Sequence, residues 1–230
     1  MPKVPLLNGV LLIFLAQFLV SCATVTVTGN KSRMVDSEGN LIEASAHSVE
    51  MQKATQGMVL LDAMWGRVWK CGGYENAQLV NFAFDKMPLT KRTNEDKPDI
   101  EIGSANTLLV DNIFDPLAIQ VPAGEYVLSG FKIKVAKSTS DVGYITVPRS
   151  ALRNDPSTFS VNPGEVVYIG HFSLDCAYSP IIWRYYIEQM NLGSARSFTN
   201  KYPFINLDSV VYRLFKTKSY GGPIIIEQKK

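Results

Sequence analysis

Residues 125–135 read Glu125-Tyr126-Val127-Leu128-Ser129-Gly130-Phe131-Lys132-Ile133-Lys134-Val135. Large apolar side chains recur at every second position, which is typical of a β-strand with one face in a protein core. The phase of this pattern changes once, at Ser129-Gly130, so that the apolar set is Tyr126, Leu128, Phe131, Ile133 and Val135. A β-bulge at Gly130 would bring all five side chains onto one continuous buried face.

Eight further segments have strand character, because they are rich in Val, Ile, Tyr, Phe and Trp and are separated by turn residues. They are residues 58–71, 78–84, 117–121, 143–147, 165–176, 181–187, 209–215 and 223–227. The one expected helix covers Ser194 to Lys201 and ends before Tyr202-Pro203, since proline disfavours a helical residue before it. This content predicts a mainly β fold, an antiparallel β-sandwich with one short helix near the C-terminus, rather than an α/β enzyme fold.

Strict alternation divides residues 165–176 into two faces. We expect the core face to hold Val166, Tyr168, Gly170, Phe172, Leu174 and Cys176. The other face then holds Val167, Ile169, His171, Ser173 and Asp175. On this interpretation His171 is a half-exposed strand residue with Asp175 as its surface partner.

Composition sets limits on function. The chain has 230 residues, of which 46% are hydrophobic and 19% charged, so it can bury a core and is not a disordered chain. Its formal net charge of +2 gives no strong field for nucleic acid or for an acidic surface.

The first 22 residues combine a basic Lys3, an apolar stretch from Val10 to Val20 and the tetrapeptide Leu19-Val20-Ser21-Cys22. The apolar stretch is too short for a membrane-spanning helix, which needs about 20 apolar residues. The segment resembles a bacterial lipoprotein signal peptide, and the tetrapeptide resembles the lipobox of that family. The resemblance implies cleavage before Cys22, a diacylglyceryl group on its thiol and often a further acyl chain, such as palmitate, on the new amino terminus. An ordinary secretory signal with a coincidental cysteine is the alternative.

Lipidation would make the chain a membrane-anchored protein, because two or three acyl chains give stable anchoring where one does not. The residue after Cys22 is Ala23 and not Asp, which resembles outer-membrane cargo in the enterobacterial sorting pattern. The expected organisation is a signal peptide over residues 1–21, a lipidated N-terminus and tether over residues 22–56, and a β-sandwich domain over residues 57–230. The tether has an alternative, in which this segment packs as the first strands of the domain.

Lipidation of Cys22 would leave Cys71 and Cys176 as an even pair in an oxidising compartment. Cys71 ends the alternating set Trp65, Arg67, Trp69 and Cys71, and both cysteines close strands expected to point inward. We expect a disulfide between them. The alternatives are two separate buried thiols or a catalytic thiol.

Recognisable catalytic patterns do not occur in the sequence. The two histidines, His47 and His171, form no metal-binding spacing, and neither a nucleophile elbow nor a phosphate-binding glycine loop is found. We therefore expect no catalytic residue, no metal and no cofactor. A catalytic triad that includes His171 is the alternative, because triad residues meet in the fold and need no spacing in the sequence. Five carboxylates lie near strand ends: Asp62, Asp111, Asp115, Glu125 and Glu165. They are expected to be solvated turn residues, and the alternative is that two of them form a pair for glycoside hydrolysis.

Aromatic residues in strands more often pack than bind sugars. Arg184 and Tyr186 are the exception, because alternation places them on the other face of their strand from Ile181, Trp183 and Tyr185. They are the expected exposed contact patch.

Two segments share a turn design in which Pro and Gly precede a Glu that begins an apolar strand: Val121-Pro122-Ala123-Gly124-Glu125 and Val161-Asn162-Pro163-Gly164-Glu165. Residues 115–175, which contain both, resemble small transthyretin-like sandwich modules of exported bacterial proteins, including lipoprotein domains of unknown function.

These inferences predict an outer-membrane lipoprotein that faces the periplasm or the cell surface. It would act without catalysis as a structural or assembly partner in the cell envelope, bound to the membrane through its lipid, with an envelope protein as partner and no nucleic acid. One alternative is a glycan or peptidoglycan binding module, which an exposed aromatic row would favour. The other is a hydrolase, which an enclosed polar pocket around His171 would favour.

Overall fold

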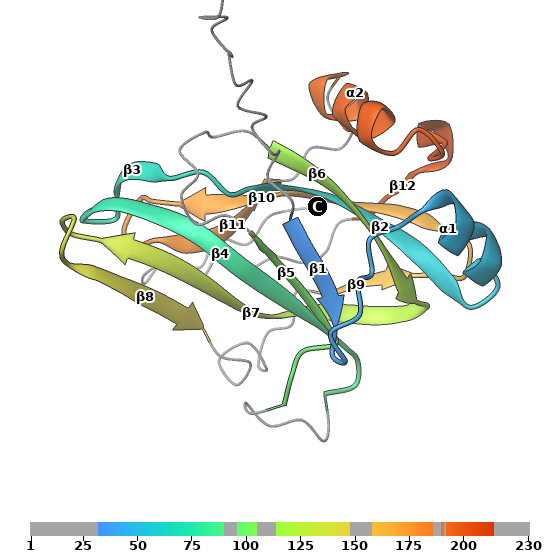
Figure 1. Cartoon of the computed structure of the whole chain (residues 1–230), viewed down its shortest axis with the longest axis horizontal. Helices are drawn as coiled ribbons and strands as arrows, with labels where there is room; N and C mark the ends of the chain where they lie inside the picture. Colours follow the sequence, from blue (N-terminus) through green and yellow to red (C-terminus); the bar gives the residue numbers. More distant parts are fainter. Residues whose placement is uncertain are drawn as a thin grey trace, which may run out of the picture.

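Two β-sheets stack face to face in the computed structural model, which describes residues 32–89, 96–104, 114–147, 158–185, 190 and 192–213 (Figure 1). Sheet A contains β1 (Ser32–Asp36), β3 (Val68–Cys71), β4 (Tyr74–Lys86), β5 (Ile100–Ser104), β7 (Gly124–Ala136), β8 (Val142–Val147) and β9 (Thr158–Val161). Sheet B contains β2 (Gln56–Met64), β6 (Phe114–Pro122), β10 (Val166–Asp175), β11 (Ile181–Tyr185) and β12 (Val211–Tyr212). The predicted mainly β sandwich is confirmed.

Sheet A has the order β1-β5-β4-β7-β8, with β3 paired to β4 and β9 paired to β7. Sheet B has the order β11-β10-β2-β6, with β12 paired to β10. Neighbouring strands are antiparallel except that β10 runs parallel to both β2 and β12. The centre of sheet B therefore joins segments that are far apart in the chain.

The predicted bulge in β7 is confirmed. Ala83 of β4 lies opposite Gly130 and Phe84 lies opposite Leu128, which leaves Ser129 as the extra residue. The five apolar side chains of the strand all belong to the core between the sheets: Tyr126, Leu128, Phe131, Ile133 and Val135. In the same core Phe82 of sheet A stacks on Phe172 of sheet B, with ring centroids 4.7 Å apart.

The expected faces of β10 are wrong before Gly170 and right after it, since Tyr168 lies in the cluster under α2 while Phe172 and Leu174 lie in the core between the sheets. The register against β2 shifts between Tyr168 and His171, where Gly170 has a φ of 104°. As a result Val167 and Ile169 share the core between the sheets with Phe172 and Leu174. Strict alternation failed because β10 contains a bulge like that of β7.

The expected single strand over residues 58–71 is also two strands in different sheets. β2 ends at Met64 in sheet B, and β3 begins at Val68 in sheet A. Within β3 the alternation breaks at Lys70, whose φ is 55°, so that Trp69 is exposed while Cys71 is fully buried. The expectation that these two side chains share an inward face is wrong.

Residues 32–56 belong to the folded domain and do not form the expected tether. β1 pairs along its whole length with β5, and its Met34 is buried in the core. α1 (Ala46–Gln52) follows, with Ser45 as its N-cap. The alternative of packed first strands fits residues 32–36, whereas residues 22–31 lie outside the described part of the chain.

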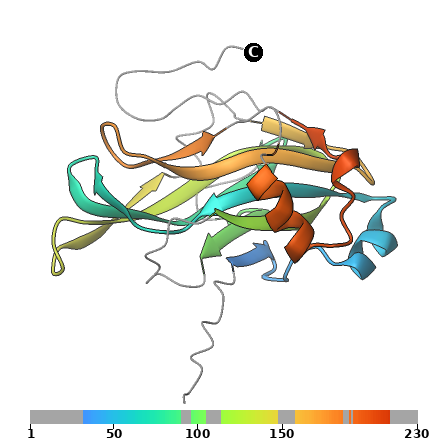
Figure 2. The same cartoon turned by 90° about the horizontal axis from the view of Figure 1, so that it is seen from above.

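The expected C-terminal helix is α2 (Leu192–Lys201), and α1 is a second helix that the sequence did not indicate. A short 3-10 helix, Leu207–Ser209, follows α2 before β12. α2 packs on the outer face of sheet B in a second apolar cluster around Met58, Leu60, Tyr168 and Phe198. Figure 2 shows both helices towards one end of the molecule and the tips of the β3–β4, β7–β8 and β10–β11 hairpins at the other.

Candidate functional site

The hairpin end of the sandwich is closed by the predicted disulfide, which is confirmed. Cys71 and Cys176 are bonded across 105 residues, with their Cα atoms 4.5 Å apart. The bond joins the β3–β4 hairpin of sheet A to the end of β10 in sheet B. Gly72 and Gly73 form the hairpin turn with φ values of 55° and 84°, which suits the Gly-Gly preference of such turns.

A buried polar cluster lies on the outer face of sheet B, beneath α2. Asp62 of β2 is 1% exposed and His171 of β10 is 4% exposed. One carboxylate oxygen, Asp62 Oδ2, accepts hydrogen bonds from the hydroxyls of Tyr168 at 2.8 Å and Ser194 at 2.6 Å. The hydroxyl of Tyr168 also lies 3.0 Å from His171 Nε2.

His171 is therefore buried and not half-exposed, and its acidic neighbour is Asp62 rather than Asp175. Its Nδ1 lies 3.1 Å from Asp62 Oδ2, an ion-pair distance without hydrogen-bond alignment. His171 lies on the face opposite Phe172 and Leu174, as expected, but α2 packs on that face and buries it.

The contacts in this cluster differ from those of a catalytic triad. In a triad the nucleophilic hydroxyl bonds the histidine, which in turn bonds the carboxylate. Here Ser194 bonds the carboxylate directly, and the Tyr168 hydroxyl contacts both Asp62 Oδ2 and His171 Nε2. Burial and the nearby Asp62 charge raise the pKa of Tyr168 well above its ordinary value of 10, so this hydroxyl stays protonated. The cluster is suited to holding α2 on sheet B.

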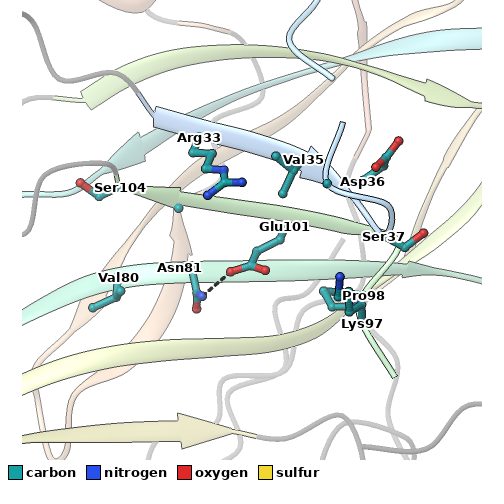
Figure 3. Close-up of a pocket in the computed structure, with 12 residues that line it drawn as sticks. Arg33, Val35, Asp36, Ser37, Val80, Asn81, Lys97, Pro98, Glu101 and Ser104 are labelled. Carbon is teal, nitrogen blue, oxygen red and sulfur yellow. Dashed lines mark hydrogen bonds between the residues drawn. The ribbon is translucent and has the colours of Figure 1, made fainter. Parts of the chain in front are cut away.

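A groove of about 580 Å³ lies on the outer face of sheet A, over β1, β5 and β4. Figure 3 shows Arg33, Asn81 and Glu101 reaching into it from these three strands. Asn81 Nδ2 donates to Glu101 Oε1 at 2.7 Å. Lys97 and Asp36 lie at its rim, and a side-chain hydrogen bond from Asn40 lowers the pKa of Asp36, so this carboxylate is ionised at neutral pH. The groove can offer a guanidinium, an amide and carboxylates to a polar ligand.

Exposed aromatic side chains continue along the outer face of sheet A. Trp69 of β3 is 52% exposed and Tyr144 of β8 is 56% exposed. Lys132 Nζ lies 4.4 Å above the centroid of the Tyr144 ring. No sequence pattern singled out this face, because two of the strands that build it, β1 and β5, were not expected.

The other predicted site residues fall as follows. Cys22 and Tyr186 lie outside the described residues, and Arg184 lies in β11 with its backbone paired to Phe172. The lipidation site and the contact patch therefore stay predictions. Of the five carboxylates considered, Asp62 lies in the buried cluster, Asp115 bonds Lys201, Glu165 bonds Arg213, Glu125 is exposed, and Asp111 lies outside the described residues.

Comparisons with protein-family models, with curated proteins and with solved structures found no match for this chain. The resemblances to lipoproteins and to transthyretin-like modules thus stay predictions. Among the described residues no cluster of three or more His, Cys, Asp or Glu is placed to hold a metal ion. Within the same part of the chain, no helix has the length and apolarity needed to span a membrane.

Proposed function

We propose that this protein is exported and anchored to the outer membrane by a lipid on Cys22, and that it acts in the cell envelope by contact rather than by catalysis. The disulfide between Cys71 and Cys176 is the observation that carries the proposal. Disulfides form and persist in oxidising compartments such as the bacterial periplasm and are rare in the cytosol. Together with the lipobox-like tetrapeptide, the bond supports passage out of the cytoplasm.

The buried polar cluster supports the non-catalytic part of the proposal. Asp62 and His171 are the residues that an enclosed hydrolase site would use, and the hydroxyls around them bond Asp62. Both side chains are almost fully buried, and Ser194 of α2 bonds Asp62 from above. This argument favours a structural role for the cluster.

The first test is the state of Cys22. Mass spectrometry of the mature amino terminus should find a lipidated cysteine, and Cys22→Ala should release the protein from the membrane fraction. Cys71→Ser with Cys176→Ser serves as the control, since the loss of cysteines outside the lipobox should leave membrane fractionation unchanged. An unmodified terminus that starts elsewhere would contradict the proposal.

The second test is complementation of a deletion strain. His171→Ala, in a protein that remains folded and lipidated, should retain function, whereas replacement of Arg184 and Tyr186 together should abolish it, because interface energy concentrates in a few aromatic and Arg anchors. Loss of function in His171→Ala would favour the hydrolase instead. Full function of the double variant would contradict the prediction that Arg184 and Tyr186 form a contact patch.

A glycan-binding module is the second function that an observation favours. Trp69 and Tyr144 are exposed on one face of a β-sheet, where rings can stack on sugars. Envelope proteins that act by contact include those that hold polysaccharide, so this alternative is compatible with lipid anchoring.

A further inference from the structure

The register of sheet A places a row of side chains across five strands. Arg33 of β1 pairs with Gly103 of β5, which pairs with Asn81 of β4, followed by Lys132 of β7 and Thr146 of β8. Paired residues of neighbouring strands project to the same face. The sequence neighbours of this row point into the core: Met34, Ile102, Phe82 and Ile133. The row therefore lies on the outer face of the sheet.

Gly103 makes the row concave. It has no side chain between Arg33 and Asn81, and a Cβ added there would meet Asn81 Cβ and the Val80 carbonyl oxygen, both at 3.4 Å. The floor of the groove in Figure 3 is thus backbone at this point, with polar side chains on either side.

Two further rows extend the same face towards the hairpin end. One joins Lys134 and Tyr144 to Gln78, whose side chain is buried and donates to the Trp65 carbonyl oxygen. The other joins Trp69, Asn76, Ala136 and Val142. The second row crosses four strands, or about 14 Å at the usual strand spacing.

The charges of the three rows have one sign. Arg33, Lys132 and Lys134 are cationic, and none of the described residues in the rows is acidic. Beside the rows, Glu101 lies two residues from Gly103 on the same face, where Asn81 donates to it, and Asp36 lies at the rim of the groove. The contact of Lys132 with the Tyr144 ring places a cation beside an exposed aromatic surface.

These features select a ligand class. An exposed aromatic ring stacks on the apolar face of a sugar. Amide and hydroxyl groups such as those of Asn81 and Thr146 exchange hydrogen bonds with sugar hydroxyls. Arginine and lysine bind carboxylate or phosphate groups, arginine with a two-pronged fork.

We propose that the outer face of sheet A binds an anionic oligosaccharide, with its acidic groups on Arg33, Lys132 and Lys134 and its rings on Tyr144 and Trp69. The proposal deepens the contact function above, since it names a ligand and the face that takes it. It does not depend on where the protein is anchored.

The test uses the purified full chain in detergent and three probes: an oligogalacturonate, its fully methyl-esterified form, and a phosphorylated oligomannose. Calorimetry should detect binding of the oligogalacturonate, with affinity at least about tenfold weaker for the neutral ester, because each lost charged hydrogen bond costs that much or more. Binding should also weaken as salt rises. Tighter binding of the phosphorylated probe than of the oligogalacturonate would identify a site for phosphate. The reverse order would identify a site for carboxylate.

Variants locate the site. Lys132→Gln with Lys134→Gln, and separately Arg33→Gln, should each reduce affinity for the preferred acidic probe at least about tenfold. Trp69→Ala should weaken both the acidic probes and the ester. Lys53→Gln is the matched control, because Lys53 is an exposed lysine that pairs with Glu50 beside α1, away from this face, and it should bind like the parent protein. Circular dichroism of each variant verifies that it is folded.

Four outcomes would overturn the proposal: no binding of either acidic probe, equal affinity for acid and ester, unchanged affinity in the Arg33 and lysine variants, or tighter binding of a single-stranded oligonucleotide. Each of these leaves the Cys22 fractionation test untouched. Failure of the ligand proposal and failure of lipid anchoring are thus read from different experiments.

Discussion

Gly57 lies near the start of β2, directly beneath the turn that leads from β9 into β10. A Cβ at this position would lie 2.5 Å from the Asn162 carbonyl oxygen and 2.5 Å from Val161 Cγ2. We expect Gly57→Ala to destabilise the protein by about 1–3 kcal/mol, since backbone must move to make room. Urea denaturation followed by circular dichroism measures the change.

Gly143→Ala is the control for this prediction. Gly143 also lies in a strand, but its added Cβ would meet only Val135 Cγ2 at 3.8 Å, an ordinary contact. A Gly57→Ala variant as stable as Gly143→Ala would show that the turn yields without cost.

Three tyrosines make stability sensitive to alkaline pH. Burial raises the pKa of Tyr126, Tyr168 and Tyr202 above the ordinary value of 10. The folded state keeps these phenols protonated while the unfolded state loses their protons, so their contribution is complete below about pH 10 and is lost as pH rises further. The urea midpoint should fall between about pH 9 and about pH 11.5.

Tyr126→Phe separates this effect from general alkaline damage. The variant loses a hydrogen bond to the Pro122 carbonyl oxygen, 2.6 Å long, but it also removes one of the three titrating groups. Its midpoint should start lower and then fall less steeply with pH. If the urea midpoint fell equally steeply with pH in the parent protein and the variant, Tyr126 would not be one of the groups responsible.

Single residues also explain which predictions from sequence held. The bulge in β7 was predictable because only one face of that strand is apolar, so a change of phase is visible. β10 is buried on both faces, from Val167 to Leu174, and gives no phase to read at Gly170. At Lys70 a left-handed backbone separates Trp69 from Cys71, and lysine carries no signal for that conformation.

At the scale of elements, α2 is held on sheet B by a few identifiable contacts. Ser194 donates to the buried Asp62, Tyr202 donates to Glu43 at 2.9 Å, and Phe198 is buried against the edge of the Tyr168 ring. Ser194→Ala leaves a buried carboxylate with one donor fewer. We expect a loss of about 1–3 kcal/mol and faster hydrogen exchange of the α2 amides.

Ser197→Ala on the same helix is the matched control. Ser197 is exposed, and its hydroxyl donates to the Gly193 carbonyl oxygen within α2. Its substitution should leave exchange at the α2 contact with sheet B unchanged. Equal exchange rates in the two variants would contradict a role for Ser194 in docking.

The elements that the sequence did not indicate share a physical cause. α1 contains no buried residue, so it has no apolar periodicity, and β1 has a single buried residue, Met34. Both were consequently assigned to a tether. The groove on sheet A needs β1 and β5 as neighbours of β4, and this register comes from pairing between distant segments.

At the scale of the whole molecule, the disulfide connects the two sheets at the hairpin end. On the chain-entropy model a loop of 105 residues is worth up to about 4–5 kcal/mol. We expect Cys71→Ser with Cys176→Ser to lower the free energy of unfolding by an amount up to this size, measured by urea denaturation. Reductant should lower the midpoint of the parent protein and have no effect on the double variant.

An unchanged midpoint in the double variant would show that packing alone holds this end together. The pairing itself was predictable from an even cysteine count after lipidation and from two strand ends. The closeness of Cys71 and Cys176 depends on how the sheets stack, which no local pattern contains.

The parallel pairing of β2 with β10 bears on how the protein is made. Met58 lies opposite Val166, more than a hundred residues later in the chain. Contacts between such distant segments slow folding, and until β10 is synthesised one edge of the apolar strand β2 has no partner in the chain. The nascent protein thus passes through a stage with an unpaired, aggregation-prone strand edge. Its biogenesis should accordingly depend on chaperones that hold the chain unfolded until its last strands have arrived.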